Sequence, residues 1–136
     1  MKYKAKSFID LFNSLHDEIS CREFLEYQRW HGEPICPHCH RQSKEHYRLK
    51  RQGLYKCKSC HKTFSVTVGT MFEGSHVPLM KWFYAIYIFL SHKKGISSTQ
   101  LAKDIGVTQK TAWFILERIR PELHGKFIAT FNNLTQ

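Results

Sequence analysis

Four of the five cysteines in this 136-residue chain form two identically spaced pairs. Each pair has the form C-x2-C, and seventeen residues separate the two pairs. A tight C-x2-C turn directs two thiolates at one ion, and a second turn brought back by a hairpin completes a tetrahedral sulfur site. The spacing therefore predicts one structural Zn²⁺ ion, with these ligands: Cys36, Cys39, Cys57 and Cys60.

Other uses of paired cysteines fit the sequence less well. A redox C-x2-C usually occurs singly in a βαβ setting, which is absent here, and iron–sulfur clusters use different spacings. Two disulfides would need an oxidising compartment, but the first residues lack the continuous apolar run of a secretory signal. We therefore expect a cytoplasmic protein. Four thiolates fill a structural site, so His38, His40 and His61 are expected outside the ligand set. His40 and His61 follow the turns at a position that can require positive φ.

The cysteine region is also the most basic part of the chain. The formal net charge is +10, and residues 36–67 carry eight basic side chains and one acidic side chain. Two extended runs around Gly53 and a third over 62–68 predict a three-stranded antiparallel sheet. Basic residues interleaved with Tyr47 and Tyr55 suit contact with nucleic-acid phosphates. The alternative is a solvated face whose tyrosines pack the hairpin. The predicted phosphate contacts are Arg48, Lys50, Arg51 and Lys56.

The second half of the chain has the pattern of a helix-turn-helix. Pro78 suits the first turn of an apolar helix, for which Gly95 is the expected C-cap. Ser97 with Gln100 then predicts the start of a short helix, Gly106 a tight turn, and Thr108 the cap of a second helix. Apolar residues at i, i+3, i+4 and i+7 give that second helix one buried face: Ala112, Ile115, Leu116 and Ile119.

In a helix-turn-helix, the first residues of the second helix meet base edges in the major groove. The predicted DNA-contacting residues are Thr108, Gln109, Lys110, Thr111, Phe114 and Arg118. A plain helical hairpin would show a similar pattern, so that alternative stays open. The longest apolar stretch, residues 79–90, has only twelve residues. A membrane span needs about 20, so we expect a buried helix and no membrane partner.

These motifs define a small multi-module α+β protein with four segments. We expect N-terminal helices in 1–33, a zinc ribbon in 34–70, the helix-turn-helix in 76–124 and a tail in 125–136. The first segment should hold two amphipathic helices, over 7–18 and 20–33, with Ser20 and Glu23 forming a capping box at the second. Its formal charge of −1 favours a scaffold or partner contact over DNA contact.

The order of these motifs resembles the N-terminal part of bacterial insertion-sequence transposases of the ISXO type. The resemblance covers about residues 20–124, from "RWHGEPICPHCH" through "YKCKSCHKTFSVTVGTMFEGSHVPLMKWFYAIY" to "KKGISSTQLAKDIGVTQKTAWFILERIR". It implies a zinc ribbon and a helix-turn-helix that bind transposon ends. Such transposases continue into a DDE-type catalytic domain, whereas only twelve residues follow His124. We therefore expect a truncated relative, a remnant or a fragment of a longer gene product, and expect that this chain is not itself an enzyme.

Three functions compete at this point. The leading hypothesis is sequence-specific binding of double-stranded DNA at transposon ends, with a full-length transposase or a second copy of the chain as further partners. The second is a zinc-ribbon adaptor that binds a protein. The third is an RNA or single-strand binder that uses the tyrosine-bearing hairpin. Strong salt-dependent binding to duplex DNA would separate the first from the second, and competition with single strands would address the third.

Overall fold

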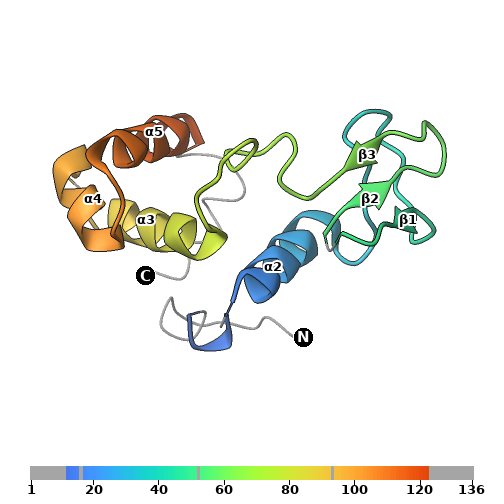
Figure 1. The fold of residues 1–136 in the computed structure, drawn as a ribbon, viewed down its shortest axis with the longest axis horizontal. Helices are drawn as coiled ribbons and strands as arrows, with labels where there is room; N and C mark the ends of the chain where they lie inside the picture. Colours follow the sequence, from blue (N-terminus) through green and yellow to red (C-terminus); the bar gives the residue numbers. More distant parts are fainter. Residues whose placement is uncertain (1–11, 16, 52, 93, 123–136) are drawn as a thin grey trace. The chain divides into compact units, whose positions relative to one another are not determined.

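The computed structural model describes residues 12–15, 17–51, 53–92 and 94–122. The chain divides into two compact units (Figure 1). One is Ile19–His76, called here the ribbon unit, and the other joins Met1–Glu18 to Val77–Gln136, called here the helical unit. The predicted α+β class is confirmed. The division into four segments remains a prediction, and its tail at 125–136 lies outside the described residues.

The ribbon unit combines one helix with a small sheet. Helix α2 spans Glu18–Trp30, with its first residue in the helical unit, and is followed by β1 (Tyr47–Arg48), β2 (Tyr55–Lys56) and β3 (Thr63–Phe64). The strands form an antiparallel sheet in the order β1-β2-β3. The predicted three-stranded sheet is therefore confirmed, with strands of two residues each.

An aromatic cluster forms the core beneath this sheet. Tyr55 stacks on Phe64, its partner across β2 and β3, with ring centroids 5.6 Å apart. The ring of Trp30, at the end of α2, meets both of these rings edge-on at 5.5 and 5.7 Å. His46 closes the cluster by an edge-on contact with Phe64 at 5.5 Å. Because a sheet of two-residue strands buries little by itself, α2 supplies an essential wall of this core.

Polar side chains of α2 also hold the sheet and the loop after it. The Arg29 guanidinium donates to the carbonyl oxygens of Val66 and Val68, both at 2.8 Å. Burial lowers the pKa of Arg29, while the Glu73 carboxylate opposes this shift. The Tyr55 hydroxyl donates to the Glu26 carboxylate at 2.8 Å, and burial together with Glu26 raises the pKa of Tyr55 to about 12. The helix is thus fixed to the sheet by specific hydrogen bonds as well as by packing.

The N-terminal boundary of α2 differs from the sequence-based expectation. The helix begins at Glu18, so Ser20 lies inside it and the predicted capping box at Ser20 is wrong. The expected apolar face is present, with four buried residues: Cys21, Phe24, Leu25 and Trp30. Half of the preceding helix predicted over 7–18 lies outside the described residues, and 12–14 are helical.

The helical unit contains α3 (Leu79–Ser91), α4 (Ser98–Ile105), α5 (Gln109–Ile119) and the short 3-10 turn η1 (Arg120–Glu122). Its core is formed by fully buried side chains from all three α-helices, among them Trp82, Phe83, Leu101, Ile115 and Leu116. The predicted buried face of α5 is confirmed. In the described part of the chain, no helix is long and apolar enough to cross a bilayer.

Caps explain where these helices begin and end. Ser97 accepts a hydrogen bond from the backbone N–H of Gln100, and Thr108 accepts one from that of Thr111, as predicted. Gly106 ends α4 in the left-handed conformation, with φ of 72°. The predicted C-cap of α3 at Gly95 is wrong, because the helix ends at a C-cap on His92 and Gly95 lies in the turn that follows.

Pro78 is the N-cap of α3 and offers no side-chain acceptor. The Glu18 carboxylate instead accepts from the N–H of Met80 at 3.2 Å. An acidic group at a helix N-terminus satisfies an unpaired donor and complements the helix dipole. Glu18 therefore caps a helix sixty-two positions away in sequence.

Candidate metal centre and nucleic-acid interface

The four paired cysteines meet at one place in the ribbon unit. Their Sγ atoms all lie within 4.8 Å of one another. Cys36 and Cys60 approach to 3.6 Å, and Cys39 and Cys57 to 3.5 Å. A tetrahedral ion with Zn–S bonds of about 2.3 Å would place its sulfur atoms about 3.8 Å apart. The cluster thus has the composition and the dimensions of a four-thiolate zinc site.

The two cysteine pairs lie on two separate turns that have the same backbone hydrogen bond. In the first turn the N–H of His40 donates to the carbonyl of Cys36 at 2.8 Å, and in the second His61 donates to Cys57 at 3.1 Å. His40 and His61 have φ of 65° and 63°, which confirms the predicted positive φ at both positions. The repeated sequence therefore encodes a repeated backbone geometry, which points two thiols inward from each turn.

Backbone N–H groups surround the sulfur atoms. Cys57 Sγ accepts from the N–H groups of Ser59 and Cys60, both at 3.4 Å, and Cys36 Sγ accepts from that of His38 at 3.4 Å. Burial acts to raise the pKa of Cys57, but these N–H donors together with the thiols of Cys39 and Cys60 outweigh it and hold that pKa at about 6. At Cys60 burial and the neighbouring thiols outweigh a backbone hydrogen bond and raise the pKa to about 11. Such N–H donors also orient and stabilise thiolate ligands of a metal.

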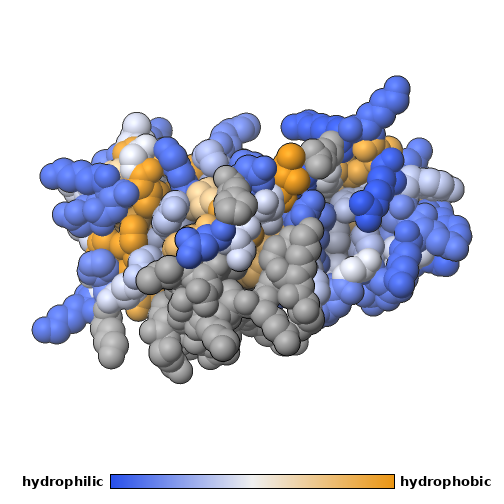
Figure 2. Space-filling view, turned by 90° about the horizontal axis from the view of Figure 1, so that it is seen from below, coloured by the Kyte–Doolittle hydropathy of each residue, from blue (hydrophilic) through white to orange (hydrophobic). Residues whose placement is uncertain are grey.

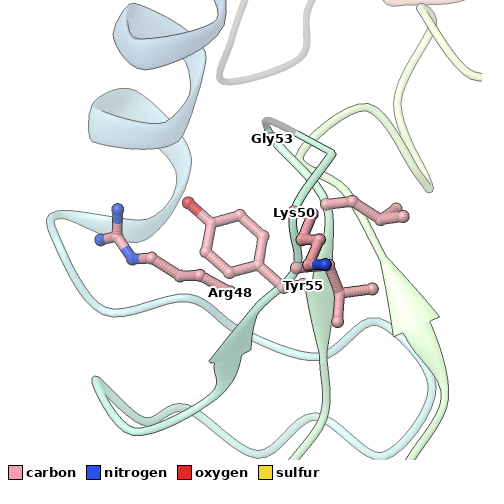
Figure 3. Close-up of a pocket in the computed structure, with 6 residues that line it drawn as sticks. Arg48, Lys50, Gly53 and Tyr55 are labelled. Carbon is pink, nitrogen blue, oxygen red and sulfur yellow. The ribbon is translucent and has the colours of Figure 1, made fainter.

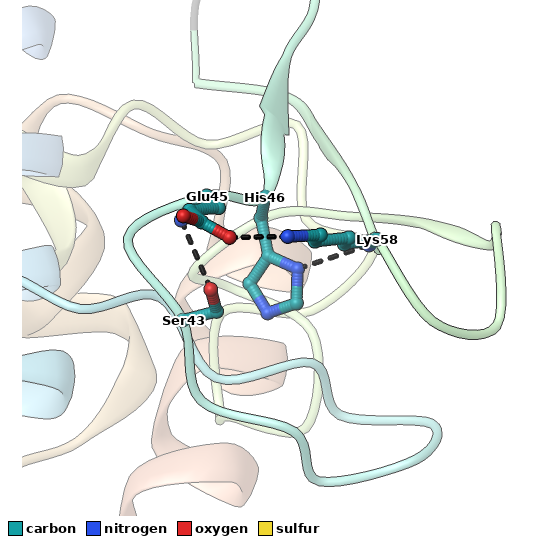
Figure 4. Close-up of polar contacts among 4 residues, drawn as sticks. All are labelled: Ser43, Glu45, His46 and Lys58. Atoms are coloured by element: carbon teal, nitrogen blue, oxygen red, sulfur yellow. Dashed lines mark hydrogen bonds and ion pairs between the residues drawn. The ribbon is translucent and has the colours of Figure 1, made fainter.

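His46 links the two cysteine turns and was not among the residues predicted from the sequence. Its Nδ1 accepts from the N–H of Lys58 at 3.1 Å, and its Nε2–H donates to the carbonyl of Arg41 at 2.9 Å. Lys58 directly follows Cys57 and Arg41 closes the first turn, so one buried imidazole, 5% exposed, joins both. Figure 4 shows the ring beside Lys58, whose ammonium also pairs with Glu45.

The remaining histidines near the cluster lie outside the group of possible ligands. His38, His40 and His61 are exposed, and the His38 ring lies 3.3 Å from the carbonyl oxygen of Thr63. Among the described residues, the four cysteines are the only group of three or more His, Cys, Asp or Glu side chains placed to hold a metal. A fifth cysteine, Cys21, is fully buried in the core of the ribbon unit.

The predicted phosphate contacts lie on the hairpin formed by β1 and β2 and on its turn. Arg48, Lys50 and Arg51 are exposed and Lys56 is half-buried. Arg48 and Lys50 line a pocket of about 170 Å³ with Gly53 and Tyr55 (Figure 3). Figure 2 shows a mostly hydrophilic surface over the ribbon unit. The structure therefore places two of these cations, Arg48 and Lys50, at one pocket of the hairpin.

The two tyrosines of the hairpin separate into different environments. Tyr47 is 53% exposed, whereas Tyr55 is 5% exposed and donates to Glu26. Tyr55 therefore packs the core, and only Tyr47 is free to stack on a base. The Arg48 guanidinium lies 5.7 Å from the centroid of the Tyr55 ring.

The turn Gly106–Thr108 joins α4 to α5 and positions the start of α5. Gln109 and Lys110 are exposed at this end, next to the cap at Thr108, and Thr111 is half-buried. The Gln109 amide donates to Ser98 Oγ at 2.7 Å, which orients it from the start of α4. Lys81 of α3 donates to the carbonyl of Gly106 at 3.0 Å and fixes the turn.

Phe114 and Arg118 lie on the flank of α5. The Phe114 ring meets the fully buried ring of Trp82 edge-on at 6.4 Å, and Arg118 lies over Phe114 at 4.9 Å. Both side chains are half-buried. The exposed stripe instead runs through Gln109, Lys110 and Trp113, and the sequence-based list omitted Trp113, which is 53% exposed. Its position three residues after Lys110 could have indicated this.

The sulfur cluster, its paired turns and the three-stranded sheet define a zinc-ribbon protein. Residues 16–63 match the transposase zinc-ribbon domain family. The chain is also 36% identical over 116 residues to an uncharacterized protein in transposable element ISH50 of Halobacterium salinarum. That alignment covers 79% of the chain and 39% of the relative, so the chain spans well under half of that protein's length. No solved structure matches the chain. The predicted resemblance to insertion-sequence transposases is confirmed.

Proposed function

We propose that this chain binds double-stranded DNA in a sequence-specific manner, as the end-recognition part of a transposase. The observation that carries the proposal is the exposed N-terminal turn of α5, which displays Gln109 and Lys110 beside a rigid, capped turn. In helix-turn-helix proteins this turn reads base edges, where Gln pairs with adenine and Lys with guanine or a phosphate. The relation to transposases supports transposon ends as the target.

The ribbon unit supplies sequence-independent contacts in this proposal. The hairpin carries few acids and four basic side chains: Arg48, Lys50, Arg51 and Lys56. The nearby acid Glu45 is already paired with Lys58. Cationic side chains on a fixed scaffold position a protein on the phosphate backbone without reading sequence. Tyr47, exposed beside Arg48, is available to stack on an unpaired base.

One structural Zn²⁺ ion holds this scaffold, bound by Cys36, Cys39, Cys57 and Cys60. The sulfur spacing supports it, as do the N–H groups directed at Cys36 and Cys57. The ion supplies folding free energy to strands too short to persist alone. Because four thiolates leave no position for a water molecule, the site is structural rather than catalytic.

Binding should be measured with the zinc-loaded full chain and fluorescently labelled duplexes at increasing salt concentration. We expect steep weakening, with a slope that falls by about 0.9 for each phosphate contact removed. Selection from a random-sequence pool should enrich one motif. Gln109→Ala or Lys110→Ala should change that motif, whereas Lys94→Ala, a control at an exposed lysine in the turn before α4, should leave it unchanged.

Two outcomes would replace the proposal. Single strands that compete as well as duplex would indicate an RNA or single-strand binder. Failure to bind any nucleic acid at low salt would indicate an adaptor for a protein partner. If binding occurs but neither Gln109→Ala nor Lys110→Ala alters the enriched motif, α5 is not the recognition helix.

A further inference from the structure

Trp113 is the one large apolar side chain that α5 exposes. It is 53% exposed, whereas the opposite face of the same helix is buried at Ala112, Ile115, Leu116 and Ile119. Trp113 follows Gln109 by four residues and Lys110 by three, so all three share one side of the helix. The neighbouring Phe114 differs, because its ring packs against Trp82.

The exposure of this tryptophan indicates that it contacts a binding partner. Its large ring is buried in most proteins, and it binds most strongly where one part is apolar and another can donate a hydrogen bond. The residues around it are basic or polar: Lys110 lies one turn before it, and Glu117, one turn after it, is paired with Arg120 at 2.7 Å. Lysine is depleted in the cores of protein–protein interfaces and favoured against DNA, so the surroundings favour a groove of duplex DNA.

We propose that Trp113 contacts the C5-methyl groups of thymine and thereby selects thymine in the recognised site. This inference rests on the proposed function, in which α5 enters the major groove. The thymine methyl is the apolar group that the major groove displays, and side chains recognise it by apolar contact. Gln109 and Lys110 then read hydrogen-bonding edges, while Trp113, one turn further along α5, reads methyl groups.

The test replaces thymine by deoxyuridine, which removes only the methyl group. The probe is the duplex enriched from a random-sequence pool by the wild-type chain, with each thymine replaced in turn. The wild-type chain should lose about fourfold in affinity for each contacted methyl, from the transfer free energy of one buried carbon. Trp113→Ala should bind the thymine duplex more weakly and should no longer distinguish it from the deoxyuridine duplex.

Tyr47→Ala provides the matched control, because Tyr47 is an aromatic residue with the same exposed fraction, 53%, in the ribbon unit. Loss of its stacking contact would lower both affinities equally, so this variant should retain the full affinity ratio between the thymine and deoxyuridine duplexes. Trp113→Phe, which keeps an apolar ring, should retain part of that difference. Circular dichroism should show wild-type helix content in each variant, since both side chains are exposed.

Several results would overturn the inference while leaving duplex binding intact. These are an enriched site without thymine, a wild-type chain insensitive to every deoxyuridine replacement, or a Trp113→Ala variant that still discriminates. If the wild-type chain is a dimer, and Trp113→Ala is a monomer that still prefers thymine, Trp113 contributes to self-association instead. Failure of the wild-type chain to enrich any duplex would instead refute the proposed function itself.

Discussion

Replacement of His46 should weaken zinc binding although His46 is not one of the candidate ligands. Its ring joins the carbonyl of Arg41 to the N–H of Lys58, and so joins the two cysteine turns. His46→Phe is the most informative change. It keeps an aromatic ring to meet Phe64 and removes both hydrogen bonds.

The size of the effect follows from the two hydrogen bonds that are lost. His46 is 5% exposed, so its two hydrogen bonds lie in a region where water does not easily replace them. The Lys58 N–H is left without an acceptor, which costs about 1–3 kcal/mol when buried, and Lys58 is itself exposed, which favours the lower end. The Arg41 carbonyl keeps the N–H of Cys36 as a donor at 3.0 Å and loses one hydrogen bond, worth about 1 kcal/mol. A total of about 2 kcal/mol converts to about thirtyfold weaker zinc binding where metal binding and ribbon folding are coupled.

Competition with a coloured chelator at fixed pH measures this affinity. Amide hydrogen exchange at Lys58 provides a local measurement, because its N–H loses its acceptor in the variant. His38→Ala is the control within the same ribbon. His38 is exposed, and its ring makes one contact, at 3.3 Å to Thr63, so zinc affinity should change by less than about fivefold.

The reasoning would be refuted by a His46→Phe variant that keeps wild-type zinc affinity and wild-type protection of the Lys58 amide. Equal weakening in His46→Phe and His38→Ala would also count against it. In that case, removal of any histidine beside the cluster would weaken zinc binding, and the two specific hydrogen bonds would not be responsible.

Three further predictions concern the metal, a helix cap and a buried phenol. Metal analysis under reducing conditions should find one zinc per chain, and Cys57→Ser should lose it; full zinc retention in that variant would contradict the ligand set. Glu18→Ala should destabilise the helical unit by about 1 kcal/mol in urea unfolding, because Met80 N–H loses its acceptor, whereas Glu33→Ala should change it little. Because burial and Glu26 raise the pKa of Tyr55 to about 12, ultraviolet titration should show a late-ionising tyrosine that Tyr55→Phe removes. The neutral phenol's contribution to ribbon stability should be complete below about pH 10 and lost as the pH rises through 12.

Features fixed by short-range chemistry could be predicted from the sequence. Cysteine spacing identified the sulfur cluster, and the position after each turn identified the positive φ of His40 and His61. Ser97 and Thr108 were predicted as caps because a cap depends on residues only three positions apart. The same rule wrongly predicted Ser20 as a cap, because α2 begins at Glu18, two residues before Ser20.

Features that depend on distant packing could not be predicted in this way. Tyr47 and Tyr55 look alike in the sequence, and only the position of α2 decides that Tyr55 is buried against Trp30. His46 is one of nine histidines, and its role depends on Arg41 and Lys58 meeting across a turn. The helical period correctly assigned the buried face of α5, but it does not show which outward side chains a neighbouring helix covers, as α3 covers Phe114.

Packing also explains why α2 belongs to the folding unit of the zinc ribbon. Cysteine pairs mark where a zinc ribbon holds its metal, but three strands of two residues cannot bury an aromatic core. Trp30 covers Tyr55 and Phe64, Glu26 accepts from Tyr55, and Arg29 binds the loop after β3. The match to the transposase zinc-ribbon family begins at residue 16, before α2, and ends at 63, within β3. Because helix and sheet are stable only together, the folding unit that presents the basic hairpin includes this helix, and substitutions at Trp30 should weaken zinc retention as well as packing.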